Sequence, residues 1–200
     1  MFEPGDLIAC YGHDPLSWVI EWGTGSLVAP GRLRRSPSHV AIICAAPEVD
    51  PDPVWVESTT LCDRTCLIRK AAVSGVQVHH PAERIEDYLR SGGRVDIYRL
   101  TDINRFGKGE SQLLSKILLN YFVRPALPYD YAGAALSGTR VFQWTRWFPA
   151  ADLQSLFCSE LVAAVLMRLN RLNHDNPTRF HPGRLLRELV RTGKYRRVAG

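Results

Sequence analysis

Short apolar runs separated by turn residues dominate the first half of the chain. Runs of this length, rich in β-branched residues and bounded by Gly, Pro or Asp, are typical of strands. They predict strands at 5–11, 38–44, 54–59, 66–69, 75–79 and 94–100. The second and third runs are joined by a segment rich in Pro and Asp, residues 47–53, which has the composition of a turn. These two strands are therefore expected to pair antiparallel within a small sheet.

The apolar pattern changes to helical spacing in the second half. Apolar residues between 113 and 122 recur at intervals of one, three and four, and Pro125 ends the run. The same spacing predicts further helices at 154–172 and 182–191, and shorter ones at 16–22 and 82–90. Strands followed by helices are the pattern of an α+β domain.

Length and composition fit one compact domain. The chain has 200 residues, of which 46% are hydrophobic and 22% charged, and this excludes a disordered or collagen-like protein. We expect a single domain over residues 1–200. No apolar run approaches the roughly 20 residues that a membrane span needs, and the first residues lack the features of a signal peptide. The expectation is a cytoplasmic protein as encoded, although a phage or a specialised secretion system could deliver it elsewhere.

Positive charge is concentrated at the C-terminal end. The net charge is +5, and residues 161–200 hold nine Lys and Arg against two acids. The arginines that could contact an anionic surface are Arg184, Arg187, Arg191, Arg196 and Arg197. A solvated helix face is the favoured alternative, because interleaved aromatics and a nucleic-acid motif are both missing. No nucleic-acid partner is expected, and the oligomeric state stays open.

The cysteines do not form a disulfide framework. They are Cys10, Cys44, Cys62, Cys66 and Cys158, an odd number with irregular spacing, which favours a reducing compartment. Cys62 and Cys66 are four positions apart, but no second Cys or His pair lies nearby at the spacing of a zinc site. We therefore expect no metal and no cofactor, and we expect His79 and His181 to be surface or turn residues.

Cys158 is the candidate nucleophile. It falls in the first turn of the helix expected from residue 154, directly before the apolar stripe that would anchor this helix. A helix N-terminus favours the thiolate through its unpaired amides and its dipole. The alternative is a buried structural cysteine, which is common for a thiol beside an apolar run.

His39 and Glu57 could complete a catalytic group. They lie 18 positions apart on the two strands of the expected hairpin, and an even separation allows both side chains to face the same side of the sheet. A carboxylate bonded to one ring nitrogen would leave the other nitrogen for the thiol. The alternatives are a satisfied core histidine and a glutamate that ends an edge strand.

Five short motifs, taken in order along the chain, resemble one family. They are Gly5-Asp6-Leu7-Ile8, Ser38-His39-Val40-Ala41-Ile42, Val56-Glu57-Ser58, Tyr129-Asp130 and Phe157-Cys158-Ser159-Glu160-Leu161-Val162. The set resembles the circularly permuted papain-like cysteine hydrolases, the YiiX/YebB-like group of the NlpC superfamily, which is related to lecithin retinol acyltransferase. As in that group, the histidine precedes the cysteine. The resemblance implies a permuted papain-like fold, in which a small antiparallel sheet packs against the nucleophile helix and further helices.

The resemblance also implies residue roles. It assigns Cys158 as nucleophile, His39 as general base, Glu57 as the polar third residue and Tyr129 as a residue lining the cleft near the oxyanion site. A core aromatic with a satisfied hydroxyl is the alternative for Tyr129. The chain departs from the pattern in an aromatic-rich insertion at about 134–152, which could be a lid over an apolar substrate or could pack over the sheet.

The function expected from these residues is acyl transfer by a cysteine hydrolase. The resemblance implies a peptidase or amidase that cleaves an amide bond, for example in a cell-wall peptide. Its acyltransferase branch keeps open a hydrolase or transferase of lipid esters or thioesters. A non-catalytic binding module is the third alternative. The expected partner is a peptide or a small substrate that contains an acyl group.

Overall fold

Six strands form one antiparallel sheet in the order β4-β3-β2-β1-β5-β6. The computed structural model describes residues 1–13, 15–26, 29, 31–60, 62–128 and 157–200. The strands are β1 (Leu7–Tyr11), β2 (His39–Cys44), β3 (Val54–Thr59), β4 (Gly75–His79), β5 (Arg94–Leu100) and β6 (Tyr195–Ala199). The expected α+β class and the antiparallel β2–β3 hairpin are confirmed.

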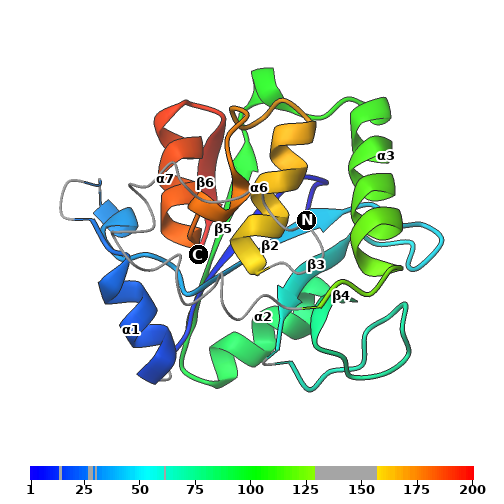
Figure 1. Ribbon diagram of the computed structural model, residues 1–200, viewed down its shortest axis with the longest axis horizontal. Coiled ribbons are helices and arrows are strands. Elements are labelled where there is room, and N and C mark those ends of the chain that lie inside the picture. Colours follow the sequence, from blue (N-terminus) through cyan, green and yellow to red (C-terminus); the bar gives the residue numbers. More distant parts are fainter. Residues whose placement is uncertain (14, 27–28, 30, 61, 129–156) are drawn as a thin grey trace.

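Helices cover both faces of this sheet (Figure 1). The α-helices of the described residues are α1 (Pro15–Gly23), α2 (Pro81–Arg90), α3 (Lys108–Lys116), α6 (Cys158–Arg168) and α7 (Pro182–Arg191). α3 continues directly into a π-helical segment, η3 (Ile117–Val123), and short 3-10 turns lie at η1 (Gly31–Arg34), η2 (Asp102–Asn104) and η4 (Pro177–Arg179). None of the helices in the described residues is long and apolar enough to cross a membrane.

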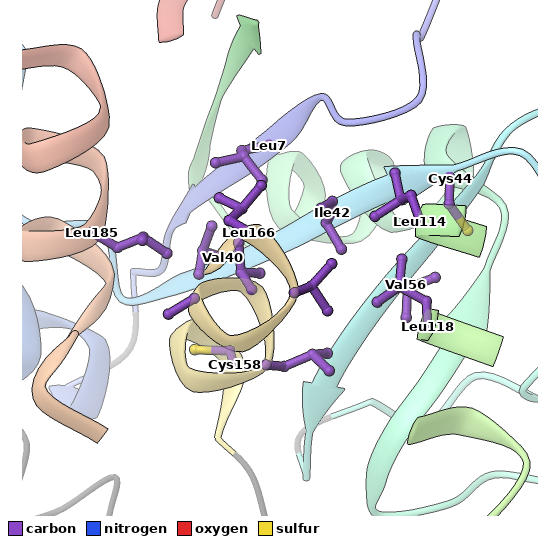
Figure 2. Packing of buried hydrophobic residues seen from close by; sticks show 14 of the residues in the cluster. Leu7, Val40, Ile42, Cys44, Val56, Leu114, Leu118, Cys158, Leu166 and Leu185 are labelled. Atoms are coloured by element: carbon purple, nitrogen blue, oxygen red, sulfur yellow. The ribbon is translucent and has the colours of Figure 1, made fainter. Parts of the chain in front are cut away.

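The larger apolar core lies on the face covered by α3, α6 and α7. Alternate strand residues point to this face, because the side-chain period of a strand is two. Figure 2 shows Leu166 of α6 above Val40 of β2, with Leu185 of α7 on one side and Leu114 of α3 on the other. All four side chains are fully buried. This packing fixes α6, and with it the residue at its N-terminus, relative to β2.

The opposite face of the sheet carries a smaller core beneath α2. Its fully buried members include Ile8, Ile43 and Trp55, and α2 contributes Ile85 and Tyr88. His39, Glu57 and His79 have the same strand parity as these apolar residues, so the polar positions point toward α2. The α2 side of the sheet therefore holds a cluster of buried polar groups beside its smaller apolar core.

Two strand predictions fail, for different physical reasons. Residues 66–69 form a turn, in which the backbone N–H of Cys66 donates to Ala71 and that of Lys70 donates back to Cys66. β6 was not predicted, because four of its five residues are exposed and carry no alternating apolar pattern. It pairs with β5 as an edge strand, where burial does not select the side chains.

The helix that carries Cys158 also begins later than predicted. Phe157 is its N-cap, with extended backbone angles of φ −91° and ψ 169°, so α6 begins at Cys158 and not near residue 154. The predicted insertion at 134–152 lies outside the described residues, and the single-domain expectation stays a prediction.

Candidate active site

Cys158 is the first residue of α6. Its N-cap, Phe157, makes no side-chain cap hydrogen bond. The thiol therefore lies at the end of the helix where the first backbone N–H groups have no partner within the helix and where the helix dipole is positive. Leu161, Val162 and Val165 are fully buried and anchor the helix behind it. Cys158 itself is 4% exposed. These features are those of a rigidly held thiol at a helix N-terminus.

His39 and Glu57 are hydrogen bonded. The His39 Nε2 donates to Glu57 Oε2 over 2.7 Å, and the glutamate is fully buried. The register pairs Ile42 with Val56, which puts Glu57 diagonally across from His39 on the same face of the sheet. The structure therefore has the same-face arrangement that the even spacing predicted.

His39 also interacts with Cys158. Burial alone would lower the pKa of His39, but the charge of Cys158 and a hydrogen bond with it raise that pKa, as does Glu57, and the result is about 9. Because Nε2 is bonded to Glu57, Nδ1 is the ring nitrogen left to exchange a proton with the thiol. His39 of β2, Glu57 of β3 and Cys158 of α6 thus belong to one buried group, which resembles a catalytic triad.

Arg84 of α2 holds the carboxylate from its other side. Its Nε donates to Glu57 Oε1 over 2.7 Å and its Nη2 to Oε2 over 3.3 Å. Burial would raise the pKa of Glu57, but His39 and then Arg84 lower it to about 2. The glutamate is therefore a carboxylate at any pH at which the protein would work.

Neither Arg84 nor Tyr88 was predicted from the sequence as part of the site. Pro81, Arg84, Ile85 and Tyr88 follow the i, i+3, i+4, i+7 pattern of an inward helix face, and Arg84 is only 5% exposed. A charged residue on the inward face of an amphipathic helix was the available signal. The Tyr88 ring stacks on His39, with 6.3 Å between ring centroids and 19° between ring planes. His39 is thus held by Glu57 at one nitrogen and by an aromatic ring on its face.

A second thiol and imidazole lie beside the same glutamate. His79 Nε2 lies 3.6 Å from Cys62 Sγ and 3.9 Å from Glu57 Oε1, and it donates to Gln77 Oε1 over 2.9 Å. The ligand atoms of Glu57, Cys62 and His79 all lie within 4.8 Å of one another. The expectation of a surface His79 is wrong, because this side chain is 2% exposed. His79 is buried because it lies on β4 opposite Trp55 of β3, a contact that its position at the end of a sequence run does not show.

His181 is likewise buried, at 3% exposure, contrary to the expectation of a surface residue. It is the N-cap of α7, and its Nδ1 accepts a hydrogen bond from the backbone N–H of Arg184. Burial, with the charges of Arg187 and Arg184, lowers the pKa of His181 to about 3. A neutral imidazole can therefore act as an acceptor there, and the residue has a structural role.

The C-terminal arginines are largely engaged in intramolecular contacts. Arg187 donates to the backbone oxygens of Leu33 and Thr24, and Arg184 donates to that of Arg179. Ion pairs join Arg191 to Glu188, Arg196 to Asp102 and Arg197 to Asp96. These contacts favour a structural role, and contact with an anionic surface stays a prediction.

A cavity of about 890 Å³ lies away from the catalytic group. Ala45 and Pro47, just beyond the C-terminal end of β2, belong to its lining, together with Arg99, Lys108 and Ser115. His39 lies at the other end of the same strand. This cavity therefore lies at the end of β2 away from His39. Tyr129, the remaining predicted site residue, lies outside the described residues.

The comparisons with known proteins support the fold. No family model and no curated protein matches the chain. Among solved structures, the chain is similar to the crystal structure of metalloprotein yiiX from Escherichia coli O157:H7. The TM-score is 0.55 at 17% sequence identity, and the match covers 98% of this chain and 96% of that chain. The chain thus has a YiiX-like fold over nearly its whole length, as the motif resemblance implied.

Proposed function

We propose that this protein is a cysteine hydrolase that cleaves an amide bond through a thioester on Cys158. One observation carries the proposal: His39 is bonded to Glu57 at Nε2 over 2.7 Å and has its pKa raised to about 9 by Cys158 at the N-terminus of α6. A structural cysteine beside a core histidine would not need a buried carboxylate bonded to that histidine. The YiiX-like fold agrees with this reading but does not assign an activity.

In the first half of the reaction, the Cys158 thiolate attacks the carbonyl carbon of the substrate. The backbone N–H of Cys158, free at the helix N-terminus, is placed to donate to the oxyanion that forms. His39 then gives its proton to the leaving amine as the C–N bond breaks, and the acyl group stays on sulfur.

In the second half, water attacks the thioester carbon. His39, now neutral, takes a proton from this water, and the C–S bond breaks to release the carboxylic acid. Glu57 holds the imidazole in the orientation and tautomer that both half-reactions need, and Arg84 keeps Glu57 ionised. Glu57 itself exchanges no proton with the substrate.

The substrate class rests on the motif resemblance. An amide within a peptide, including a cell-wall peptide, is the proposed substrate, and lipid esters or thioesters are the competing class. A matched panel of amide, ester and thioester probes with the same acyl group, followed by intact mass and peptide mapping, tests this choice. We expect an acyl adduct on Cys158 and none in Cys158→Ala.

The outcomes of this panel separate the alternatives. Turnover of the amide supports a peptidase or amidase, and adducts formed only from esters or thioesters would favour the lipid-directed alternative. Cys62→Ala is the matched control, because it removes a similarly buried thiol on the far side of Glu57. An adduct with none of the probes, in a folded protein, would support a non-catalytic binding module.

A further inference from the structure

The cluster of Cys62, His79 and Glu57 has the donor set of a soft-metal site. A thiolate, an imidazole nitrogen and a carboxylate oxygen are the three ligand types that Zn²⁺ prefers in proteins. Their atoms come from the segment after β3, from the end of β4 and from β3, so the fold and not a sequence motif assembles them. Sequence spacing could not have shown this set.

Two of the three separations between ligand atoms are close to those around a tetrahedral ion, and the third is at most 4.8 Å. Ligands at about 2.3 Å for sulfur and about 2.0–2.1 Å for nitrogen and oxygen, at tetrahedral angles, lie roughly 3.3–3.6 Å apart. The Sγ–Nε2 distance is 3.6 Å and the Nε2–Oε1 distance is 3.9 Å. Small side-chain adjustments would therefore bring these atoms to coordination distance. Gln77 Oε1 accepts a hydrogen bond from the same Nε2 over 2.9 Å, and binding of an ion would break this bond.

Arg84 sets a limit on which ion can bind. Its guanidinium is 2.7 Å from Glu57 Oε1, the same oxygen that faces His79. A hard cation held by oxygen alone would gain one carboxylate and face this positive charge. A thiophilic ion also gains the Cys62 thiolate, whose negative charge offsets part of the charge of the ion, whereas the charge of Glu57 is shared with Arg84 and His39. A donor set of this kind favours Zn²⁺-like ions over Mg²⁺ or Ca²⁺.

We propose that Cys62, His79 and Glu57 bind one thiophilic divalent cation, Zn²⁺ or its analogue Co²⁺. On binding, the Cys62 thiol releases one proton, and the Nε2 proton of His79 passes to Nδ1, so that Sγ, Nε2 and Oε1 each supply a lone pair. Glu57 Oε2 stays on His39. The ion would thus share one carboxylate with the catalytic group, without contacting Cys158.

Co²⁺ titration of the full chain tests this proposal. Absorption from thiolate-to-cobalt charge transfer should saturate at one equivalent, and Zn²⁺ should abolish it by displacement. The titration is made on Cys158→Ala, so that the thiol of the catalytic group cannot bind the ion and the result does not depend on turnover. In this background, Cys62→Ser and His79→Gln should each weaken binding by more than ~100-fold, since even outer-shell changes cost about 10–100-fold.

Cys66→Ser is the matched control. Cys66 is also buried, lies four positions from Cys62 and accepts a hydrogen bond from the backbone N–H of Val78, but it is outside the cluster. Its variant should bind Co²⁺ as tightly as the parent. If Cys62→Ser fails to fold, Cys62→Ala and His79→Gln carry the test.

Three results would overturn the proposal. One is the absence of a charge-transfer band in Cys158→Ala, and another is a band that survives both Cys62→Ser and His79→Gln. The third is a band that is seen only while Cys158 is present, because it would assign the metal to the thiol of the catalytic group. A failed search for substrates would leave the cobalt result unaffected, so the two proposals can fail separately.

Discussion

Glu57 stands between two pairs that have the same composition and different chemistry. On its Oε2 side lies His39, which interacts with the Cys158 thiol, and on its Oε1 side lies His79, which contacts the Cys62 thiol. The pKa of His39 is raised to about 9, whereas burial lowers the pKa of His79. The comparison shows that surroundings, and not residue type, decide which thiol can be a nucleophile.

Two differences account for the contrast. His39 is 2.7 Å from the Glu57 carboxylate, whereas His79 is 3.9 Å from it. The positive charge of Arg84 lowers the pKa of His79 further. Cys158 begins a helix, whereas Cys62 lies in an irregular segment where burial raises its thiol pKa. Arg84 binds Glu57 Oε1, the oxygen that faces His79, and Glu57 Oε2 accepts the short hydrogen bond from His39.

The largest expected effect separates the two thiols. Cys158→Ala should reduce turnover by about a million-fold, the scale of losing a nucleophile in a hydrolase, whereas Cys62→Ala should keep it within about tenfold. Steady-state assays on the substrate identified from the probe panel measure both, with circular dichroism to verify folding. Equal activities in the two variants would remove the distinction between the pairs.

The two histidines should differ next. His39→Ala removes the general acid and base and should lower turnover by about 10²–10⁴-fold. His79→Gln leaves the catalytic group in place and should change it little. The comparison of kcat for the two variants makes the test, and a greater loss for His79→Gln would exchange the roles assigned here.

Changes at Glu57 should follow a graded order. Glu57→Gln can still accept a hydrogen bond from His39, whereas Glu57→Ala cannot. Turnover should therefore fall from wild type to Glu57→Gln, then Glu57→Ala, then His39→Ala. Full activity in Glu57→Ala would make the carboxylate merely structural.

Substitution of Arg84 should lower the free energy of unfolding. Arg84→Met removes one of the two cationic partners of the fully buried Glu57 and leaves His39 as the other. Breaking a buried ion pair costs about 3–5 kcal/mol, and this is the upper limit here because His39 stays in place. Arg84→Lys keeps the charge and should cost less. Urea unfolding of both variants measures this, and an unchanged free energy in Arg84→Met would show that the ion pair adds no net stability.

The smallest effect is a shift in pH dependence. His39 must be protonated to release the amine, so kcat/KM should fall as pH rises through about 9. Because the charge of Glu57 raises the pKa of His39, Glu57→Gln should move this descending limb to lower pH, whereas His79→Gln should leave it in place. A limb that moves in His79→Gln alone would contradict the assignment.

Local patterns predicted much of the fold. β2 and β3 were found because their apolar runs and the turn between them are encoded in adjacent residues. β6 was missed because an exposed edge strand such as 195–199 needs no apolar alternation. The turn at 66–69 was mistaken for a strand because Leu67 and Ile68 are apolar but only partly buried.

Only the part of the candidate site that local sequence patterns encode was predicted. His39 and Glu57 followed from their even spacing, and Cys158 from the apolar stripe behind it. Arg84, Cys62 and His79 were not predicted as partners of Glu57. The docking of α2, the pairing of β4 with β3 and the position of Cys62 bring them there. These are contacts between segments far apart in the sequence, which the local spacing of apolar residues does not predict.

Competitive alkylation tests the central claim most directly, because both thiols are present in one molecule. Cys158 is 4% exposed and Cys62 is 6% exposed, so a difference in rate reports activation and not access. Wild-type protein is treated with limiting iodoacetamide near neutral pH, and the modified cysteines are mapped over time. The account predicts that Cys158 is alkylated first, more slowly in Glu57→Ala but still measurably. Modification of Cys62 first, with Cys158 inert in the folded protein, would contradict it.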